Sequence, residues 1–478
     1  MSSSIALAPD QCRRARLARD ARFDGRFFVA VVTTGIYCRP ICPAKAPLER
    51  NVRYFDTAFA AAEAGFRPCL RCRPDSAPGS PAWRGTDTTL RRALRLIDEG
   101  ALTDGNMTQL AERLGIGERH LRGLFQRRFG VSPKSYALHR QCLFAKQLLH
   151  ETQLPITEIA FASGFSSVRR FNDTFHSRIG LSPREVRRQL KTHDTPGIEL
   201  KLSYRPPYAW KTLRDFYAQR SIEGLEWVGD NYLGRHFQWG NASGKFTAYF
   251  DEPGPNNEPG QRNGCHAMRV ELTLDDLRQL APIVANIRRI LDLDADPEVI
   301  ATAIEPAIER SATDGLAKPS LVSGLRLPGI WSPFEARIRA ILGQQVSIVA
   351  ARRLTQTLVN TLGEPASDGG RYFPTPSAIA QDDLAFLGMP QRRRQTLKDL
   401  ATAIMNERDS ESISGIGPWT RDYARLRGDS DPDVWLPGDA GVKRALRQLP
   451  SVDPESATPW RSYLLLQLWN LDHEHQVR

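Results

Sequence analysis

Two closely spaced cysteine pairs place the strongest constraint on the fold of this 478-residue chain. Three residues separate Cys38 from Cys42, two separate Cys69 from Cys72, and 26 lie between the pairs. Each pair can chelate one ion from a single turn, and the loop between them can close the tetrahedron that Zn²⁺ prefers. Because the first residues lack the basic and then apolar order of an export signal, disulfides are not expected. The spacing predicts a zinc site with four cysteine ligands, which on spacing alone is most often structural.

Charge is divided unevenly along the chain. The net charge is +11, from 65 Lys and Arg against 54 Asp and Glu. Residues 1–193 hold 32 basic and 17 acidic residues, a balance of +15, which leaves 33 and 37, a balance of −4, for residues 194–478. The basic half favours a polyanion such as DNA, although a merely soluble basic surface gives the same count. No apolar run approaches the roughly 18 residues of a membrane span, so we expect a cytoplasmic chain without a membrane partner.

Changes in composition divide the chain into four predicted domains. Pro, Gly and Ser accumulate at residues 74–81, and a second break lies at residues 192–197. Helical spacing dominates before the second break and again from Pro328, whereas strand-like alternation and turns fill the region between. The predicted fold is multidomain and mainly α, with domains at residues 1–78, 84–192, 198–320 and 321–478.

The residues around the cysteines resemble a known family. Residues 20–28, 33–40 and 65–72 are closely similar to the N-terminal domain of the Ada methylation-response proteins, and the resemblance covers about residues 10–75. It implies a small α+β zinc domain in which Cys38 is both a zinc ligand and the acceptor of a methyl group from a DNA methylphosphotriester. The implied ligands are Cys38, Cys42, Cys69 and Cys72.

The implied reaction is chemically consistent with a zinc-bound thiolate. A thiolate is the nucleophilic form of cysteine, and Zn²⁺ keeps its sulfur ligands deprotonated at neutral pH. Methylation turns the Cys38 thiolate into a neutral thioether, which removes one negative charge and weakens repulsion from DNA phosphates. We therefore expect methylation to tighten DNA binding. Because the sulfur is not regenerated, Cys38 would act once, as a sensor.

An internal repeat predicts the second domain. Residues 108–115 match residues 157–164 at an offset of 49, and residues 130–133 match residues 180–183 at an offset of 50. Each copy has a short helix, a turn glycine and a second amphipathic helix, which is the order of a helix-turn-helix.

This repeat resembles the AraC-type DNA-binding domain over about residues 88–190, most clearly at residues 160–175. The resemblance implies an all-α domain that places two helices in major grooves about 34 Å apart. Exposed polar and charged side chains of those two motifs are candidate DNA contacts, although for the arginines a solvated surface is the alternative. The candidates are Glu118, Arg119, Arg122, Ser167, Arg169 and Arg170. Core positions are expected for Leu121, Phe125, Phe171 and Phe175.

Residues 415–420 predict a helix-hairpin-helix turn. Gly415 and Gly417 would let the backbone approach a DNA phosphate, and the next helix would offer its N-terminal amides. With the motifs at residues 202–208, 341–347, 373–376, 436–439 and 460–469, the turn resembles the AlkA-type 3-methyladenine-DNA glycosylases over about residues 198–478. The resemblance implies an α+β TBP-like subdomain at residues 198–320 and an all-α helix-hairpin-helix domain at residues 321–478.

The same resemblance assigns catalytic and binding roles. Asp439 is the implied catalytic aspartate, which would stabilise the positive sugar and orient water while an alkylated purine leaves without a general acid. The alternative is that Asp439 only caps a helix. Trp419, Tyr423 and Trp469 match pocket positions that grip a flipped base, although each could be a core residue.

Four further features refine what the two resemblances imply. Trp419 stands where related strand-cleaving hairpin enzymes carry a nucleophilic lysine, so a monofunctional glycosylase is expected. Gln345, a candidate DNA contact, occupies the position of an apolar wedge, often leucine, that fills the gap left by the flipped base. Residues 405–413 are short by a dozen or more residues where the family builds the first hairpin helix. The O⁶-methylguanine acceptor motif of Ada is not found, and residues 264–267 do not replace it.

These features predict a bifunctional bacterial adaptive-response protein. It would sense methylphosphotriesters through Cys38, activate transcription and excise alkylated purines such as 3-methyladenine. The expected partners are double-stranded DNA and RNA polymerase, for a monomer associated with the nucleoid in the cytoplasm. One alternative is a transcription regulator with a degenerate, inactive glycosylase half. Another is a constitutive DNA binder whose zinc is only structural.

Overall fold

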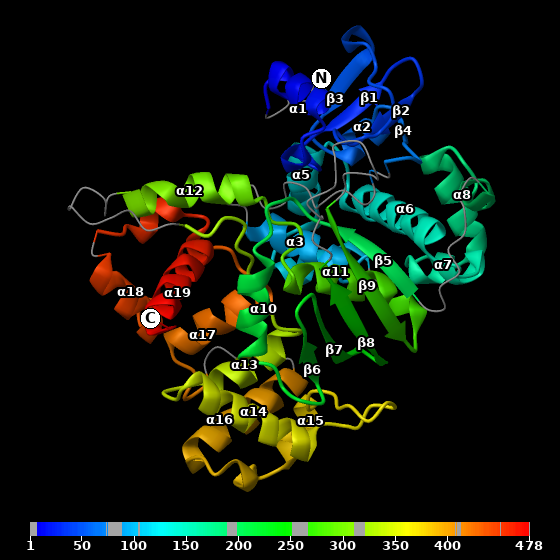
Figure 1. Cartoon of the computed structure of the whole chain (residues 1–478). Coiled ribbons are helices and arrows are strands. Elements are labelled where there is room, and N and C mark those ends of the chain that lie inside the picture. The colour runs from blue at the N-terminus through cyan, green and yellow to red at the C-terminus, as the bar shows by residue number, and fades with distance from the viewer. Residues whose placement is uncertain are drawn as a thin grey trace. The chain divides into compact units, whose positions relative to one another are not determined.

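The computed structural model describes residues 7–72, 74, 88–103, 106–188, 198–250, 266–309, 321–406, 408, 413–449 and 451–477. The chain forms two compact units (Figure 1). The first unit comprises Met1–Pro206, Phe250–Arg288 and Leu293–Ala295, and the second comprises Pro207–Tyr249, Arg289–Asp292 and Asp296–Arg478. Helices outnumber strands among the described elements, which confirms the mainly α multidomain fold.

A small α+β fold with a four-stranded sheet begins the chain. In sheet order, its strands are β3 (Val52–Phe55), β1 (Phe28–Val31), β2 (Ile36–Cys38) and β4 (Arg67–Pro68). Strand β1 is antiparallel to β2 and β3, whereas β4 runs parallel to β2. Alternation along β1 sends Val29 toward α1 (Pro9–Ala18) and Phe28 toward α2 (Ala58–Glu63). The sheet therefore has a core on each face.

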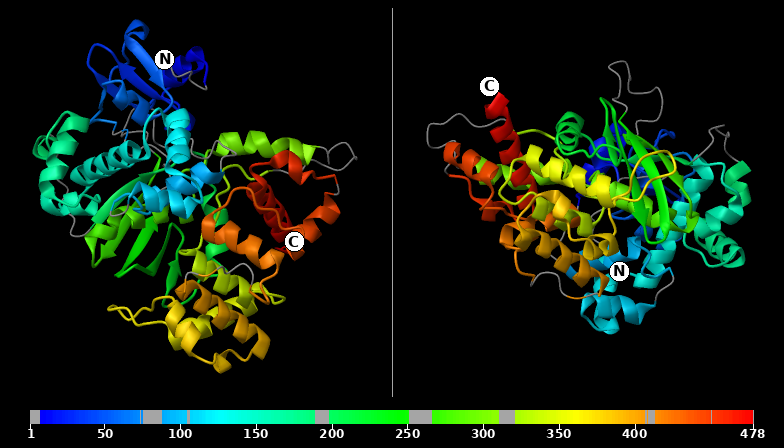
Figure 2. Two further views of the ribbon diagram at one scale, coloured as in Figure 1. Left: turned by 180° about the vertical axis from the view of Figure 1, so that it is seen from behind. Right: turned by 90° about the horizontal axis from the view of Figure 1, so that it is seen from below.

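The tandem repeat folds into seven helices in the described residues. They are α3 (Thr88–Asp98), α4 (Met107–Leu114), α5 (Glu118–Phe129), α6 (Pro133–Glu151), α7 (Ile156–Ala162), α8 (Val168–Ile179) and α9 (Pro183–Arg188). Gly115 and Gly164 have positive φ in the turns of the α4–α5 and α7–α8 motifs. The long α6 joins the two motifs and packs against α7, α8 and α9 (Figure 2). The expected core residues Leu121, Phe125, Phe171 and Phe175 are fully buried.

The predicted mixed region contributes strands to both units. In the first unit, β5 (Ile198–Ser203) is antiparallel to β9 (Ala267–Leu274), which precedes α11 (Leu280–Ile290). In the second unit, α10 (Trp210–Ala218) precedes an antiparallel meander of β6 (Glu226–Val228), β7 (Tyr232–Trp239) and β8 (Ala242–Tyr249).

The rest of the second unit is helical. Its helices are α12 (Pro297–Glu309), α13 (Pro333–Leu342), α14 (Ile348–Leu362), α15 (Pro376–Gln381), α16 (Gln391–Met405), α17 (Pro418–Ala424), α18 (Ala440–Gln448) and α19 (Arg461–Val477). Helix α13 is central, because it packs against α14, α16 and α17 (Figure 2). Ile338 and Leu342 on α13 share a core with Leu397 and Leu400 on α16. Within the described part of the chain, none of the helices combines the length and apolarity of a membrane crossing.

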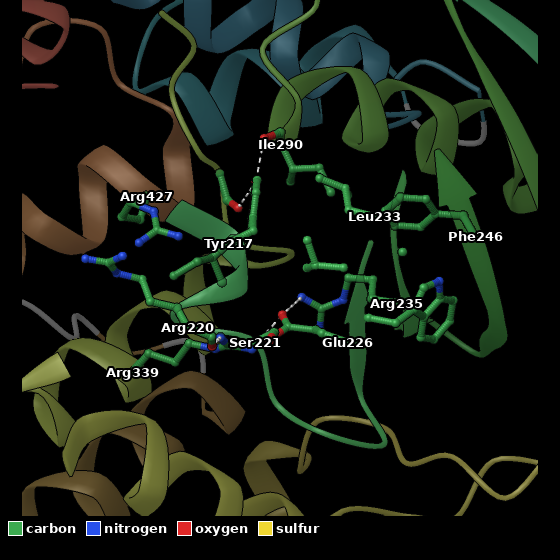
Figure 3. A pocket seen from close by; sticks show the side chains of 15 residues that line it. Tyr217, Arg220, Ser221, Glu226, Leu233, Arg235, Phe246, Ile290, Arg339 and Arg427 are labelled. Atoms are coloured by element: carbon green, nitrogen blue, oxygen red, sulfur yellow. Dashed lines mark hydrogen bonds and ion pairs between the residues drawn. The ribbon is translucent and has the colours of Figure 1, made fainter. Parts of the chain in front are cut away.

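A buried cluster of ion pairs ties the meander to α13. Arg235 on β7 donates through Nη2 to Glu335 Oε2 at 2.8 Å. Arg339, which lies one helical turn after Glu335 on α13, contacts the same carboxylate at 2.6 Å. Both guanidinium groups also contact Glu226 on β6, as Figure 3 shows. Burial opposes ionisation of Glu335, but the two arginines outweigh it and hold the pKa of that carboxyl below its usual value. The cluster thus fixes β7 and α13 beside Arg220, which follows α10.

Candidate functional site

Four cysteine sulfurs converge beside the first sheet. Cys38 ends β2, Cys42 lies in a turn where its amide donates to the Arg39 carbonyl at 3.1 Å, and Cys69 and Cys72 follow β4. All four Sγ atoms lie within 4.8 Å of one another. Sulfurs of a tetrahedral zinc site are about 3.8 Å apart, given bonds of about 2.3 Å, so this all-sulfur donor set fits Zn²⁺. Cys69 and Cys72 are buried, whereas Cys38 and Cys42 are partly exposed.

Hydrogen bonds to sulfur and a buried ion pair support this cluster. The backbone N–H of Arg39 donates to Cys72 Sγ at 3.3 Å, and that of Arg71 donates to Cys69 Sγ at 3.4 Å. The Arg39 guanidinium forms a bidentate pair with Asp24, and both side chains are buried. Donors aimed at sulfur favour the charged form, so the hydrogen bond from Arg39 acts against the burial that raises the pKa of the Cys72 thiol.

The predicted DNA-contacting arginines are exposed on the second helix of each helix-turn-helix motif. They are Arg119 and Arg122 on α5, and Arg169 and Arg170 on α8. The two polar candidates have local partners instead. Glu118 accepts a hydrogen bond from Thr108 Oγ1 at 2.6 Å, and Ser167 caps α8 by accepting from the Arg170 backbone N–H at 3.2 Å. Arg122 also pairs with Glu118, because its Nη2 lies 3.2 Å from Glu118 Oε2. Arg119, Arg169 and Arg170 are therefore better placed than Arg122, Glu118 and Ser167 to meet a polyanion.

A cavity of about 980 Å³ in the second unit collects the predicted pocket residues. Its lining includes Trp419 and Tyr423 on α17, Trp469 on α19 and Asp439, which precedes α18. Phe216 on α10 also lines it, and we call this space the aromatic cavity. Its volume lies within the range of about 300–1,000 Å³ that is usual for ligand sites.

The rings of the aromatic cavity form a continuous surface. Trp419 and Tyr423 stack with centroids 5.0 Å apart and an angle of 18° between their planes. Tyr423 meets Trp469 at 6.4 Å and 49°, and Phe216 stacks against Trp469 at 6.1 Å and 23°. Such surfaces can stack on a planar heterocycle and attract a cationic one.

Asp439 is fixed by four donors. Its Oδ1 caps α18 by accepting from the backbone N–H groups of Gly441 at 2.9 Å and Val442 at 3.1 Å, and it also accepts from Trp469 Nε1 at 2.9 Å. Its Oδ2 accepts from Trp419 Nε1 at 3.3 Å. Asp439 is thus a helix cap, and its carboxylate also lines the aromatic cavity. The two tryptophans form part of the wall and orient the carboxylate.

The hairpin turn between α16 and α17 is supported from two sides. Gly415 has φ +93°, and a Cβ at this position would lie 2.4 Å from the Thr396 hydroxyl oxygen, so the turn requires glycine. The Thr396 hydroxyl donates to the Ser414 carbonyl at 3.0 Å, and Gln344 Nε2 donates to the Gly415 carbonyl at 2.9 Å. Gly417 has φ −81° and caps α17. Both glycines are exposed.

Comparison with known sequences identifies the family. The chain matches "Metal binding domain of Ada" over residues 11–75, "Helix-turn-helix domain" over 110–189, "AlkA N-terminal domain" over 199–332, and "HhH-GPD superfamily base excision DNA repair protein" over 338–470. A Mycobacterium tuberculosis protein described as "Probable bifunctional transcriptional activator/DNA repair enzyme AlkA" is 35% identical, and the match covers 97% of each chain. The chain belongs to this bifunctional AlkA family. With the matched domain of Ada, the four converging sulfurs confirm the predicted Zn²⁺ site.

Two other relatives of this AlkA-family chain each match one part of it. DNA-3-methyladenine glycosylase 2 of Escherichia coli is 32% identical over 56% of this chain and 95% of the relative. Regulatory protein ada of Salmonella typhimurium is 34% identical over 39% of this chain and 52% of the relative. These matches confirm that an Ada-like part and an AlkA-like part are joined in one chain.

The sequence reasoning missed three residues of the aromatic cavity in this AlkA-family chain. They are Phe216, Arg220 and Arg427. Arg427 donates through Nη1 to the Tyr423 hydroxyl at 2.9 Å. Burial raises the pKa of Tyr423, but Arg427 and Arg220 outweigh it, so that pKa is lowered from its usual value. The spacing of four residues between Phe216 and Arg220, and between Tyr423 and Arg427, is the helical signal that could have revealed them.

Two features that differ from the AlkA-type family, Gln345 and the short segment at residues 405–413, lie in the second unit. Gln345 is exposed and has φ +55° between α13 and α14. Exposed apolar side chains follow it at Val346 in the loop and at Ile348 and Val349 in the first turn of α14. Of residues 405–413, residues 407 and 409–412 lie outside the described part, as does Cys265 of the motif at 264–267. Helix α16, which ends at Met405, is the described helix that precedes the hairpin.

Proposed function

We propose that this protein excises alkylated purines such as 3-methyladenine from DNA as a monofunctional glycosylase, and that Asp439 is its catalytic carboxylate. The observation that carries this proposal is the position of Asp439, held by the indole N–H groups of Trp419 and Trp469 inside the aromatic cavity. A carboxylate held by fixed donors needs little reorganisation when positive charge develops beside it.

Different residues of the cavity would bind the damaged base and stabilise the charge that develops in the reaction. A damaged nucleotide would leave the duplex stack so that its base lies against the rings of Trp419, Tyr423 and Trp469. N-alkylation makes the purine a good leaving group, and the glycosidic electron pair departs with the base. Asp439 stabilises the positive charge on the sugar and orients the water whose oxygen bonds to C1′, while one proton of that water passes to solvent. With Trp419 at the hairpin position, the chain has no lysine there for strand cleavage.

The N-terminal domain would act as a methyl acceptor through Cys38. Its sulfur attacks the methyl carbon of a DNA methylphosphotriester, the carbon–oxygen bond breaks, and the oxygen keeps the electron pair as a phosphodiester anion. Zn²⁺, when held by Cys38, Cys42, Cys69 and Cys72, keeps these sulfurs deprotonated. The partial exposure of Cys38 supports access by DNA. Cys42 is also partly exposed, so a test must distinguish these two sulfurs.

The tandem helix-turn-helix would direct the methylated protein to promoter DNA. The exposed arginines of α5 and α8 are the proposed contacts, and Gly415, Gly417 and Gln345 are proposed to contact DNA at the lesion. We also propose that the protein activates transcription through RNA polymerase, as a monomer that is associated with the nucleoid in the cytoplasm. The proposed domains are residues 1–78, 84–192, 198–320 and 321–478.

Release of bases from methylated DNA tests the glycosylase. We expect the wild-type protein to release 3-methyladenine and the Asp439→Asn variant to release little. The short segment before the hairpin favours the second candidate, a regulator with an inactive glycosylase half. No release by wild-type protein that still binds DNA would favour that regulator.

Mass spectrometry tests the sensor. After incubation with DNA that carries a methylphosphotriester, we expect one added methyl group on the peptide containing Cys38. Fragmentation separates Cys38 from Cys42, and Cys38→Ser is the matched variant. An unmodified protein would show that zinc is only structural, and methylation of Cys42 would move the acceptor role to that residue.

A further inference from the structure

A lysine of the helix-turn-helix region is buried against the zinc site. Lys146 lies on α6, the helix that joins the two motifs, and its side chain is fully buried. Its ammonium donates through Nζ to the backbone carbonyl of Cys69 at 3.3 Å. The carbonyl oxygen and Sγ of one cysteine are at most about 5 Å apart, so the ammonium lies within about 8 Å of a zinc-binding sulfur. A positive charge from one domain therefore lies beside the metal-binding residues of another.

The strand that leads into Cys69 also contacts the second helix-turn-helix motif. Strand β4 immediately precedes Cys69 and packs against α8 (Figure 1). A further contact joins α8 to α2, where Arg178 Nη1 lies 3.5 Å from Glu63 Oε1. All of these residues belong to the first compact unit. Residues 67–69 thus connect the zinc site to both α6 and α8.

Cys38 is connected to the same contact through a pair of strands. Strand β2, which ends at Cys38, runs parallel to β4, and the Cys69 backbone N–H donates to the Tyr37 carbonyl at 2.9 Å. The sulfurs of Cys38 and Cys69 lie within 4.8 Å of each other. The Cys38 sulfur is therefore about 10 Å from the Lys146 ammonium. Because this ammonium is buried, salt screens its interaction with a charge at Cys38 only weakly.

The charge of the zinc site changes when Cys38 is methylated. Four thiolates outweigh the charge of one Zn²⁺ by two, and a neutral thioether at Cys38 reduces that excess to one. At fixed geometry, the attraction between the site and the buried ammonium then falls by about half. Over about 10 Å, with an effective dielectric constant of about 20, one unit of charge changes an equilibrium constant about tenfold.

We propose that Lys146 links the zinc site electrostatically to the helix-turn-helix region, so that methylation of Cys38 weakens the contact of residues 67–69 with α6 and α8. The inference rests on the proposed methyl transfer to Cys38. Lys146 is a positioning residue, because it is buried and acts through Cys69 rather than by contact with DNA. It holds residues 67–69 firmly while the site carries its full charge, and less firmly afterwards. Methylation thereby acts on the promoter-binding domain from inside the protein.

A thermodynamic cycle in the full-length protein tests this link. The zinc affinity of the wild-type protein and of Lys146→Met, which keeps the length of the side chain but removes its charge, is measured by competition with a chelator before and after methylation of Cys38. A dinucleotide that carries a methylphosphotriester supplies the methyl group and is then removed. Lys146→Arg retains the charge. Lys134→Met is the matched control, because Lys134 is exposed near the start of the same helix.

We expect Lys146→Met to lower the zinc affinity in both states, and to lower it about tenfold more in the unmethylated protein. Lys146→Arg should keep most of the wild-type behaviour, and Lys134→Met should change neither affinity. A lysine with a merely structural role would lower the affinity by the same factor in both states. That result, or no effect in either state, would overturn the inference.

Hydrogen exchange measures the contact itself. Without DNA, the amides of Arg67 and Cys69, which donate to the Gly35 and Tyr37 carbonyls, should exchange faster in the methylated wild-type protein than in the unmethylated one. In Lys146→Met this difference should disappear. Equal exchange in the two wild-type states would overturn the inference.

A serine variant separates this inference from the methyl-acceptor proposal. If Cys38 accepts no methyl group, that proposal fails, but the electrostatic link can still be measured. Cys38→Ser removes the same thiolate charge, so the zinc-affinity cycle is repeated with Cys38→Ser in place of methylation. We expect the effect of Lys146→Met to be about tenfold smaller in the Cys38→Ser background. Equal effects in the two backgrounds would overturn the link.

Discussion

Replacing Asp439 by asparagine separates its role as a helix cap from its proposed catalytic role. Asparagine caps helices about as well as aspartate, so its oxygen can keep the three donors that Oδ1 now has. Only the contact of Oδ2 with Trp419 Nε1 changes, because an amide nitrogen would take the place of that oxygen. The substitution therefore removes the negative charge and leaves most of the local structure intact.

The expected cost in stability is small and the expected cost in rate is large. A hydrogen bond to a charged group contributes about 1.5–3 kcal/mol, and the 3.3 Å length of this one suggests the lower end. A loss of about 1.5 kcal/mol lowers the Tm of a domain of this size by about 3–6 °C. Losing a fixed electrostatic group at a reaction centre costs about 10²–10³-fold in rate. Asp439→Asn should therefore remain folded at assay temperature and lose excision.

The assay combines thermal unfolding with single-turnover release of 3-methyladenine. Asp439→Ala serves as the comparison, because it removes the cap as well, at a cost of about 0.5–2 kcal/mol in addition to the lost indole contacts. We expect both variants to lose activity and Asp439→Ala to unfold at a lower temperature than Asp439→Asn. Release by Asp439→Asn at nearly the wild-type rate would refute the catalytic role and leave Asp439 as a cap.

Three further predictions concern the hairpin, the zinc domain and the promoter-binding helices. Gly415→Ala, at φ +93°, should destabilise the hairpin by at least about 1 kcal/mol and weaken binding to damaged DNA, whereas Gly417→Ala, at φ −81°, should leave the Tm almost unchanged. Asp24→Asn removes the carboxylate charge that faces the buried Arg39 guanidinium, so thermal unfolding of the zinc domain should show a loss of about 3 kcal/mol, and a chelator should remove zinc faster; equal zinc retention would contradict this. Arg170→Ala should keep the fold and reduce the slope of log affinity against log salt by about 0.9 if Arg170 contacts a phosphate, and an unchanged slope would remove it from the interface.

The zinc site could be predicted from the sequence because its chemistry depends on residues close together in the chain. Two short cysteine spacings specify which residues can chelate one ion, and β2 and β4 only bring the two pairs together. The tandem repeat was accessible for a similar reason, since Phe171 and Phe175 follow helical spacing that predicts their burial. In both cases the information lies within a few turns of chain.

The aromatic cavity could be predicted from the sequence only in part. Trp419, Tyr423, Trp469 and Asp439 could be named from motifs, but no spacing indicated that both indole N–H groups bond to the same carboxylate. The alternative of a helix cap for Asp439 is compatible with the structure, because one oxygen caps α18 while the carboxylate lines the cavity. Local pattern could not decide between roles that one side chain performs together.

The sequence by itself determined the composition of the sites: four thiolates, paired helix-turn-helix motifs, a glycine hairpin and an aspartate among aromatic residues. It could do so because each of these depends on residue types at short, fixed spacing. Only the tertiary structure decided that Phe216 and Arg220, from the first helix of the second unit and the residues after it, line the cavity formed by α17, α18 and α19. Contacts between residues about 200 positions apart depend on how helices pack, and packing is a property of the whole core that no local pattern encodes.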